Sequence, residues 1–308
     1  MMKACIDIGG TKVAVSLNSG AGLDLVARRS EPTAKEGDNG ALARQIMRMV
    51  DEACAELDIS PGAVERAGVS SCGPFVMRHG LIEIAAPNIC GGIAGPARGL
   101  PNDWKTALLE APLRERFREV RVENDCVAAL EAERRWGALE GFDHCAYVTW
   151  STGIGCGLCV DGKVLRGKNG NAGHAGHMFV SDNTDALCGC GNVGDVEAIT
   201  AGNAIVRRFG ADAPTLFRRA QEGDPQSEAK VNELCHVIGR ALYNLTVALD
   251  LERISLGGSV FWHNRDYLLP RLKAQVKGKL PALTDGCELV AAGLQDRVGD
   301  YAALALLV

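Results

Sequence analysis

The chain has 308 residues, enough for two domains, and its 47% apolar and 23% charged residues are typical of a globular protein. A net charge of −5 argues against a surface that binds nucleic acid or an anionic membrane, and the apolar runs are too short to cross a bilayer. The N-terminus turns acidic and glycine-rich at once, so we expect no signal peptide. Twelve cysteines without a secretion signal then indicate a cytoplasmic protein with reduced thiols.

The first predicted element is a pair of strands at residues 3–17 (KACIDIGGTKVAVSL), joined by a tight glycine turn. The same pattern returns at residues 145–167 (CAYVTWSTGIGCGLCVDGKVLRG). This repetition predicts an internal duplication at the scale of a domain, because the two copies lie too far apart for a solenoid repeat.

Helical material follows each hairpin, at residues 41–57 and 227–249. In the second of these segments apolar residues recur at helical spacing. Short strands interleave with the helices, at residues 66–71, 118–124 and 253–259. Alternation of this kind indicates an α/β architecture. Residues 88–103, rich in glycine and proline, predict a loop near the mouth of a cleft.

The glycine turns suggest a phosphate site, because backbone amides in a tight turn can approach phosphate oxygens where no side chain intervenes. Neither turn has a Walker or dinucleotide pattern, since each joins two strands. A single turn of this kind is usually only a hairpin. Two matched turns favour a nucleotide held from both sides of an interdomain cleft. Their polar side chains are Asp7, Thr11, Lys12, Ser151 and Thr152.

Two further segments carry candidate chemistry. Residues 256–260 (LGGSV) follow a strand and offer a flat glycine surface to a base or ribose. Asn124 and Asp125 stand where a strand ends and a helix begins. They can cap that helix, since Asn and Asp are preferred there, or Asp125 can act as a general base in phosphoryl transfer. Both interpretations can hold together.

Taken together, these motifs resemble the ROK family (repressor, open reading frame, kinase) of sugar kinases and sugar-responsive repressors, nearly from end to end. DIGGTK and STGIGCGLCVDGKVLRG are similar to the family's two phosphate motifs, and LGGSV to its adenosine motif. APNI resembles the segment that closes over the sugar, and ENDCVAALEAE the segment with the catalytic aspartate. GNAGHAGH and CGCGNVGDVEAITAG resemble the family signature.

The resemblance implies the actin-like (ribonuclease H-like) duplicated ATPase fold, with two α/β domains around a central cleft. We place the N-terminal domain at residues 1–117, with a C-terminal helix at 293–308 packing back on it. The C-terminal domain is placed at residues 118–292, with a zinc-loop-like insertion at 170–197. A homodimer is expected from the resemblance alone.

Site residues follow from the resemblance position by position. Asp125 would deprotonate a sugar hydroxyl, most simply O6, and Asp7 would organise Mg²⁺ and the phosphates of ATP. The residues that would hold the sugar are Asn88, Asn124, Asp125, His174, His177 and Glu197. Those that would cradle the nucleotide are Asp7, Gly9, Gly10, Thr11, Lys12, Thr152 and Gly153 at the phosphates, with Gly257 and Gly258 at the adenosine.

Two positions depart from the family pattern. The family usually has Glu where this chain has His174, and the form GHAGH is similar to that of bacterial N-acetylmannosamine kinases. The family's zinc site has one His and three Cys, whereas the matching residues here are His177, Cys188, Cys190 and Asp195. Zinc accepts carboxylate oxygen, so a structural Zn²⁺ site remains chemically reasonable, although a hard ligand should weaken it. The alternative is a metal-free loop held by hydrogen bonds.

The leading hypothesis is an ATP-dependent kinase that forms the 6-phosphate of a hexose or N-acetylhexosamine. N-acetylmannosamine is the first candidate sugar because of His174, ahead of glucose and N-acetylglucosamine. A sugar-sensing repressor is the rival class, but the first motif begins at Cys5 and we expect no DNA-binding segment before it. The sugar signature also argues against a chaperone ATPase domain.

Overall fold

The computed structural model describes residues 2–20, 22–94, 99–182 and 186–308, which form two compact units. Unit 1 contains the residues up to Ala132, with Arg166–Asn171 and Gly299–Val308; unit 2 contains Glu133–Leu165 and Ala172–Val298. The sequence predicts a first domain boundary before residue 118. In the structure residues 118–132 belong to unit 1, because the strand that starts at Glu119 pairs with the sheet of that unit.

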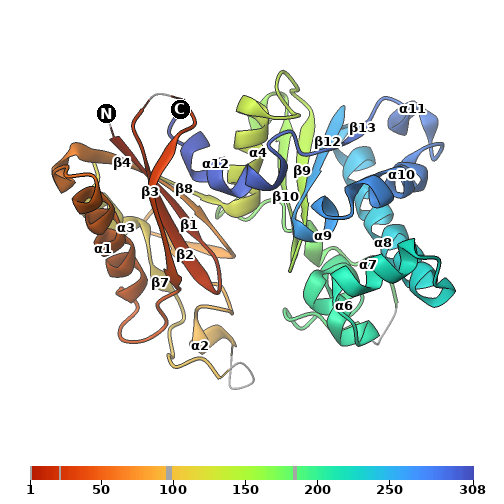
Figure 1. Ribbon diagram of the computed structural model, residues 1–308, viewed down its shortest axis with the longest axis horizontal. Helices are drawn as coiled ribbons and strands as arrows, with labels where there is room; N and C mark the ends of the chain where they lie inside the picture. The colour runs from red at the N-terminus through yellow and green to blue at the C-terminus, as the bar shows by residue number, and fades with distance from the viewer. Residues whose placement is uncertain (1, 21, 95–98, 183–185) are drawn as a thin grey trace. The chain divides into compact units, whose positions relative to one another are not determined.

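Unit 1 is built on a five-stranded sheet in the order β3-β2-β1-β4-β8 (Figure 1). Its strands are β1 (Met2–Ile8), β2 (Lys12–Asn18), β3 (Leu25–Pro32), β4 (Val64–Ser71) and β8 (Glu119–Asn124). The first three strands run antiparallel as a meander, whereas β1, β4 and β8 are parallel to one another. The predicted hairpin at residues 3–17 is therefore confirmed.

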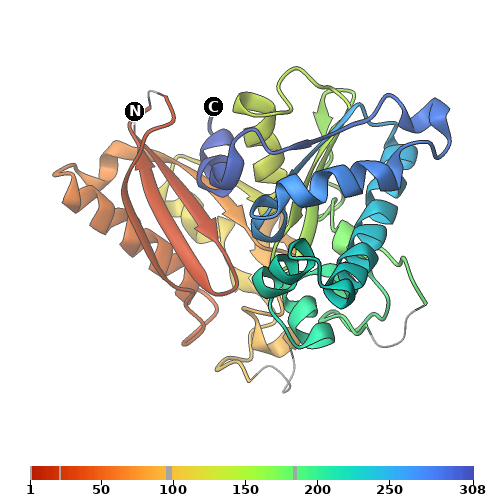
Figure 2. The same cartoon turned by 45° about the vertical axis from the view of Figure 1, so that its right-hand side comes forward.

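Helices α1 (Ala41–Glu56) and α12 (Val298–Ala305) lie on opposite sides of this sheet in both views (Figures 1 and 2). One stripe of α1 is fully buried, including Leu42, Ile46 and Met49. On the other side α12 packs so tightly on β4 that a side chain at Gly68 would clash with the carbonyl of Ala303. The apolar C-terminal segment is thus held by the sheet of unit 1.

Smaller elements complete unit 1. They are η1 (Pro61–Ala63), α2 (Gly91–Ala94), α3 (Glu110–Arg116) and a three-stranded sheet of β5 (Phe75–Arg78), β6 (Leu81–Ile84) and β7 (Ala107–Leu108). This small sheet is not among the elements predicted from the sequence. The loop predicted at residues 88–103 contains α2, and its residues 95–98 lie outside the described part of the chain.

Unit 2 repeats the same plan, with a sheet in the order β11-β10-β9-β12-β13. Its strands are β9 (Cys145–Trp150), β10 (Ile154–Val160), β11 (Lys163–Val164), β12 (Arg253–Gly257) and β13 (Glu288–Ala291). Again an antiparallel meander is followed by two parallel strands. The predicted duplication is therefore present in the topology of the two sheets.

Most helices of the described residues belong to unit 2. They are η3 (Ala175–His177), α5 (Val196–Thr200), α6 (Gly202–Phe209), α7 (Ala213–Gln221), α8 (Pro225–Leu249), α9 (Ser259–Trp262), α10 (Arg265–Val276), α11 (Pro281–Thr284) and η4 (Gln295–Arg297). Asp224 caps α8 by accepting the amide of Ser227 at 2.9 Å, and the helix buries the apolar stripe that predicted it. Within the described residues, no helix has the length and apolar character needed to cross a membrane.

Candidate functional site

In unit 1 the candidate residues gather at the carboxyl ends of three adjacent parallel strands. Asp7 near the end of β1 is paired in register with Ser70 on β4, and Ser71 is paired with Asn124 at the end of β8. The Ser70 hydroxyl donates a hydrogen bond of 3.4 Å to Asp7 Oδ1. The carboxyl edge of parallel strands is where α/β proteins bind their ligands, so this edge is a candidate site.

Asp7 has a carboxyl group with a raised pKa at this edge. Burial, and next the negative charge of Asp125, raise the pKa of Asp7 to about 6, against the smaller lowering effects of Ser70 and Lys12. Two carboxylates that repel each other at the edge of a sheet are an arrangement that a bound cation would stabilise. The donor chemistry therefore fits Mg²⁺.

Helix α4 (Asp125–Trp136) starts directly at this edge. Asn124 is buried and its Oδ1 accepts the amide of Cys126 at 3.0 Å, while Asp125 Oδ1 accepts the same amide at 2.8 Å. The Asp125 side chain is nevertheless exposed. The capping interpretation and the general-base interpretation are thus compatible in this geometry.

The first glycine turn lies in the same unit and is closed by a bond of 2.9 Å from the Gly9 amide to the carbonyl of Lys12. Asn88 lies directly against Gly10, where any side chain would clash with its amide group. The structure therefore brings together Asn88 and the first phosphate motif. Thr11 and Lys12 are exposed beside them.

In unit 2 the second turn joins β9 to β10. The Ser151 amide donates to the carbonyl of Gly153 at 3.0 Å, and the hydroxyls of Ser151 and Ser259 lie 3.0 Å apart. Glu197 on α5 accepts the amide of Ile154 at 3.0 Å, and a Cβ at Gly153 would come within 2.8 Å of its carboxylate. The contacts of Ser259 and Glu197 with this turn are findings of the structure that no sequence motif predicts.

The glycines of the predicted adenosine motif stand beside a cavity of about 470 Å³. Gly258 has a φ of 87° and caps α9, and a side chain there would meet the backbone of Trp150. The cavity lies between α7 and α9, and its lining residues are Ala213, Pro214, Arg218, Gln221, Glu222, Ser259, Val260, His263 and Asn264. The contribution of α7 was not foreseen, because no motif marks that helix.

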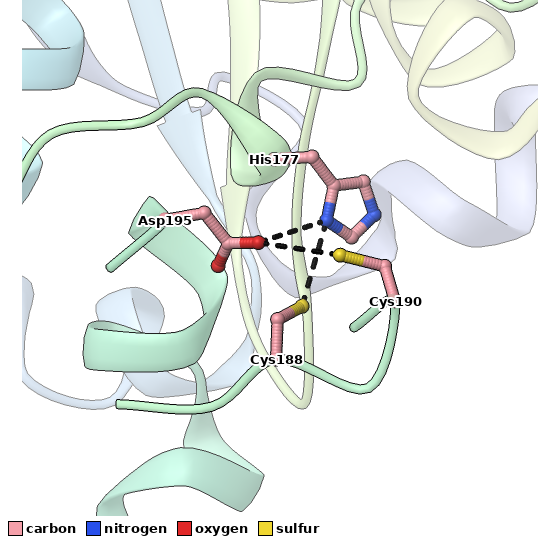
Figure 3. A group of neighbouring side chains, drawn as sticks. All are labelled: His177, Cys188, Cys190 and Asp195. Atoms are coloured by element: carbon pink, nitrogen blue, oxygen red, sulfur yellow. Dashed lines mark hydrogen bonds and ion pairs between the residues drawn. The ribbon is translucent and has the colours of Figure 1, made fainter. Parts of the chain in front are cut away.

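Four side chains in unit 2 form the candidate metal cluster (Figure 3). The ligand atoms of His177, Cys188, Cys190 and Asp195 all lie within 4.8 Å of one another. His177 Nδ1 is 3.4 Å from Asp195 Oδ2 and 3.6 Å from Cys188 Sγ, and Cys190 Sγ is 3.5 Å from the same carboxylate oxygen. The predicted four residues are therefore brought together.

The donor set of this cluster suits a zinc ion. Asp195 is fully buried, and its Oδ1 caps α5 by accepting the amide of Ala198 at 2.6 Å, which leaves Oδ2 directed at the cluster. Burial raises the pKa of the Cys188 thiol, so a cation would be needed to keep it as a thiolate at neutral pH. Two sulfurs, one imidazole nitrogen and one carboxylate oxygen make a tetrahedral Zn²⁺ site chemically reasonable. Residues 183–185 of the insertion lie outside the described residues.

His174 precedes the short helix η3 that carries His177. The two imidazole rings are 6.1 Å apart with an angle of 33° between their planes. The loop lies close to β10 at two glycines, since a side chain at Gly173 would clash with the carbonyl of Cys156 and one at Gly176 with that of Ile154. Gly173 also has a φ of +95°, which favours glycine.

Comparison with known proteins places this site in a family context. Residues 3–308 match the model of the ROK family. The chain is similar to a glucokinase of Aeropyrum pernix (29% identity, covering 98% of this chain and 95% of the other). It is also similar to an N-acetylmannosamine kinase of Shigella boydii (33% identity, 84% of each chain).

A solved ROK hexokinase from Thermus thermophilus has a similar structure, with a TM-score of 0.78, 31% identity and coverage of 99% of this chain and 97% of the other. A ROK transcriptional regulator shares the fold at 18% identity and a TM-score of 0.77. The duplicated sheets and these neighbours confirm the actin-like ATPase fold. The chain belongs to the ROK family.

Proposed function

We propose that this protein is an ATP-dependent kinase that phosphorylates the 6-hydroxyl of a hexose or N-acetylhexosamine. The observation that carries the proposal is the exposed carboxylate of Asp125 at the start of α4, next to the buried Asn124 and close enough to Asp7 to raise its pKa. A kinase needs such a carboxylate, whereas a protein that only binds sugar does not.

In the proposed reaction Asp125 takes the proton of the sugar O6 while that oxygen attacks the γ-phosphorus of ATP. The new O6–P bond forms as the bond to the β,γ-bridging oxygen breaks, and ADP leaves. Asp7 would hold Mg²⁺, which supplies charge neutralisation to the phosphates. Asn124 would orient a ring hydroxyl, and Asn88 is proposed to contact the sugar from beside the first turn.

The nucleotide is proposed to bind at the glycine turns and the cavity of unit 2. One internal bond closes each turn, from the Ser151 amide to Gly153 and from the Gly9 amide to Lys12, and other amides of the two turns are proposed to bind phosphate oxygens. The cavity of about 470 Å³ beside Gly258 is large enough for a nucleoside. These features support a nucleoside triphosphate as the phosphoryl donor, and we propose ATP.

N-acetylmannosamine is our first choice of sugar. His174 supports it, because an imidazole can donate a hydrogen bond where the family's usual carboxylate only accepts. Relatives named for N-acetylmannosamine and for glucose are both similar to this chain, so glucose is the alternative, followed by N-acetylglucosamine.

Zinc is proposed to be structural. It would fix the loop that carries His177 to the start of α5, so that Glu197 and His177 are held for the sugar. Its four ligands would come from the protein, which leaves no open position for catalysis. The cytoplasmic location is proposed from the twelve cysteines of the sequence, a composition that suits a reducing compartment, and the homodimer from the family resemblance.

A non-catalytic sugar sensor is the alternative class, because a ROK regulator shares this fold. The experiment that separates the two is incubation of the protein with Mg-ATP and sugar, followed by phosphorus NMR of the product. A phosphate signal coupled to the C6 protons of the sugar supports the kinase. Sugar that binds and is recovered unmodified would contradict it.

A further inference from the structure

Unit 2 contains a buried carboxylate that the proposed reaction does not use. Glu133 has no solvent exposure and lies near the end of α4. Its Oε2 accepts hydrogen bonds from the amide of Ala138 at 3.0 Å, the Ser255 hydroxyl at 2.9 Å and the amide of Gly293 at 2.9 Å. Its Oε1 accepts the amide of Leu294 at 2.8 Å. Four donors therefore converge on one side chain.

The backbone around Glu133 is shaped for this carboxylate. A Cβ at Gly137 would come within 2.6 Å of the Glu133 carboxylate, and a side chain at Gly293 would clash with the amide of Ala138. Glycine at both positions thus lets the backbone close around the acid. A buried carboxylate with all its donors in place is rigid, and removal of one partner leaves a buried group unsatisfied.

Glu133 joins two segments that carry residues proposed to act on the sugar and to bind the nucleotide. Helix α4 begins eight residues earlier with the proposed base Asp125, about 12 Å along the helix axis. Ser255 lies on β12, two residues before Gly257 and three before Gly258 of the adenosine motif. The amides of Gly293 and Leu294 come from the segment that leads into η4 and α12.

We infer that Glu133 is a positioning residue that couples nucleotide binding at the end of β12 to sugar binding at the start of α4. Its bond to Ser255 links β12 to α4 directly, and the three amide bonds keep the carboxylate in place. Arg253 of β12 also donates to the carbonyl of Ala138, which lies beyond the end of the helix. A helix and a strand that share one satisfied buried carboxylate shift together rather than separately. This inference rests on the proposed kinase function.

The test measures how much a nucleotide tightens sugar binding. Calorimetry gives the Kd of N-acetylmannosamine, and in parallel of glucose, with and without a non-hydrolysable ATP analogue and Mg²⁺. We expect the analogue to tighten sugar binding by the wild-type protein by about five-fold or more. Ser255→Ala removes the hydroxyl that bonds to Glu133 and leaves the three amide bonds of the carboxylate in place. It should reduce this factor to less than about two-fold while the Kd without nucleotide changes little.

Two further variants separate coupling from stability. Glu133→Gln replaces one carboxylate oxygen by an NH₂ group, which is a donor. In place of Oε2 this group faces three other donors, and in place of Oε1 it faces the amide of Leu294. In either orientation a donor is left without an acceptor, so this variant should also abolish the coupling. Thr246→Val is the matched control, because Thr246 is equally buried and its hydroxyl bonds only within α8 and to Cys287. It should lower the melting temperature and leave the coupling unchanged.

The outcomes are distinguishable. Wild-type coupling near unity, or coupling that survives in Ser255→Ala, overturns the inference while sugar phosphorylation still supports the kinase. Equal loss of coupling in Thr246→Val shows a general stability effect and also overturns it. A wild-type protein that phosphorylates no sugar contradicts the proposed function itself, and the inference with it.

Discussion

The carboxylate of Glu197 accepts a hydrogen bond of 3.0 Å from the backbone amide of Ile154. This bond ties α5, which Asp195 of the metal cluster caps, to the glycine turn between β9 and β10. A residue proposed to hold the sugar therefore also supports a turn proposed to hold phosphate.

Two substitutions of Glu197 should separate these roles. Glu197→Gln keeps an oxygen that can accept the Ile154 amide but removes the charge, so the KM for sugar should rise about ten-fold with little change in the KM for ATP. Glu197→Ala removes both the acceptor oxygen and the charge, so the KM for sugar and the KM for ATP should rise together. Steady-state kinetics with each substrate varied would check this; equal behaviour of the two variants would contradict it.

Loss of a thiol from the metal cluster should lower sugar affinity or thermal stability. We expect Cys188→Ser to lose bound zinc by elemental analysis and to weaken sugar affinity or thermal stability more than ATP affinity. Cys235→Ala is the control, since Cys235 is equally buried in α8 and outside the cluster. The zinc proposal would be contradicted if the wild-type protein contains no zinc and Cys188→Ser changes neither sugar affinity nor thermal stability.

Asp125→Asn nearly preserves shape and removes the proposed base. Turnover should fall by about 10²–10⁴-fold, because proton transfer by a placed side chain contributes that much. The Kd for sugar should stay within about three-fold of wild type. The side-chain oxygen of the new Asn can still accept the hydrogen bond from the backbone amide of Cys126. Turnover close to wild type would mean that another carboxylate is the base.

The raised pKa of Asp7 predicts a pH dependence of stability in magnesium-free protein. Folding raises this pKa from 3.8 to about 6, so the folded protein binds the proton more tightly than the unfolded chain. The stabilising contribution is present below about pH 4 and is lost as the pH rises through about 6. Asp7→Asn does not titrate and should gain up to about 3 kcal/mol over wild type across that window. Urea unfolding in EDTA measures this difference, and a constant offset between the two proteins would contradict the prediction.

Much of the fold could be predicted from the sequence where the apolar periodicity and the positions of glycine turns agree. The hairpins at residues 3–17 and 145–167 and the helix at 227–249 are confirmed because alternation and helical spacing specify them directly. The small β5-β6-β7 sheet was missed, because its strands are at most four residues long and one contains only two. Strands that short carry too little periodicity to be recognised.

The site was predictable only where a motif marks it. The four cluster residues were named from the sequence, and the structure brings them together. The bond of Glu197 to Ile154 and the contact of Ser151 with Ser259 were not predictable. Both join residues far apart in the chain, and such pairing depends on how the strands and helices pack. The predicted domain boundary before residue 118 differs from the boundary after Ala132 in the structure for the same reason. The pairing of β8 with β4 is what assigns that strand to unit 1.

The most direct test of the account is ADP release with Mg-ATP against N-acetylmannosamine, N-acetylglucosamine, glucose, mannose, fructose and allose, with Asp125→Asn as the inactive control. We predict turnover with a clear preference for N-acetylmannosamine. A preference for glucose would keep the kinase and remove His174 as the residue that sets specificity. Binding of a sugar without ADP release from any of the six would contradict the central claim and favour the sensor.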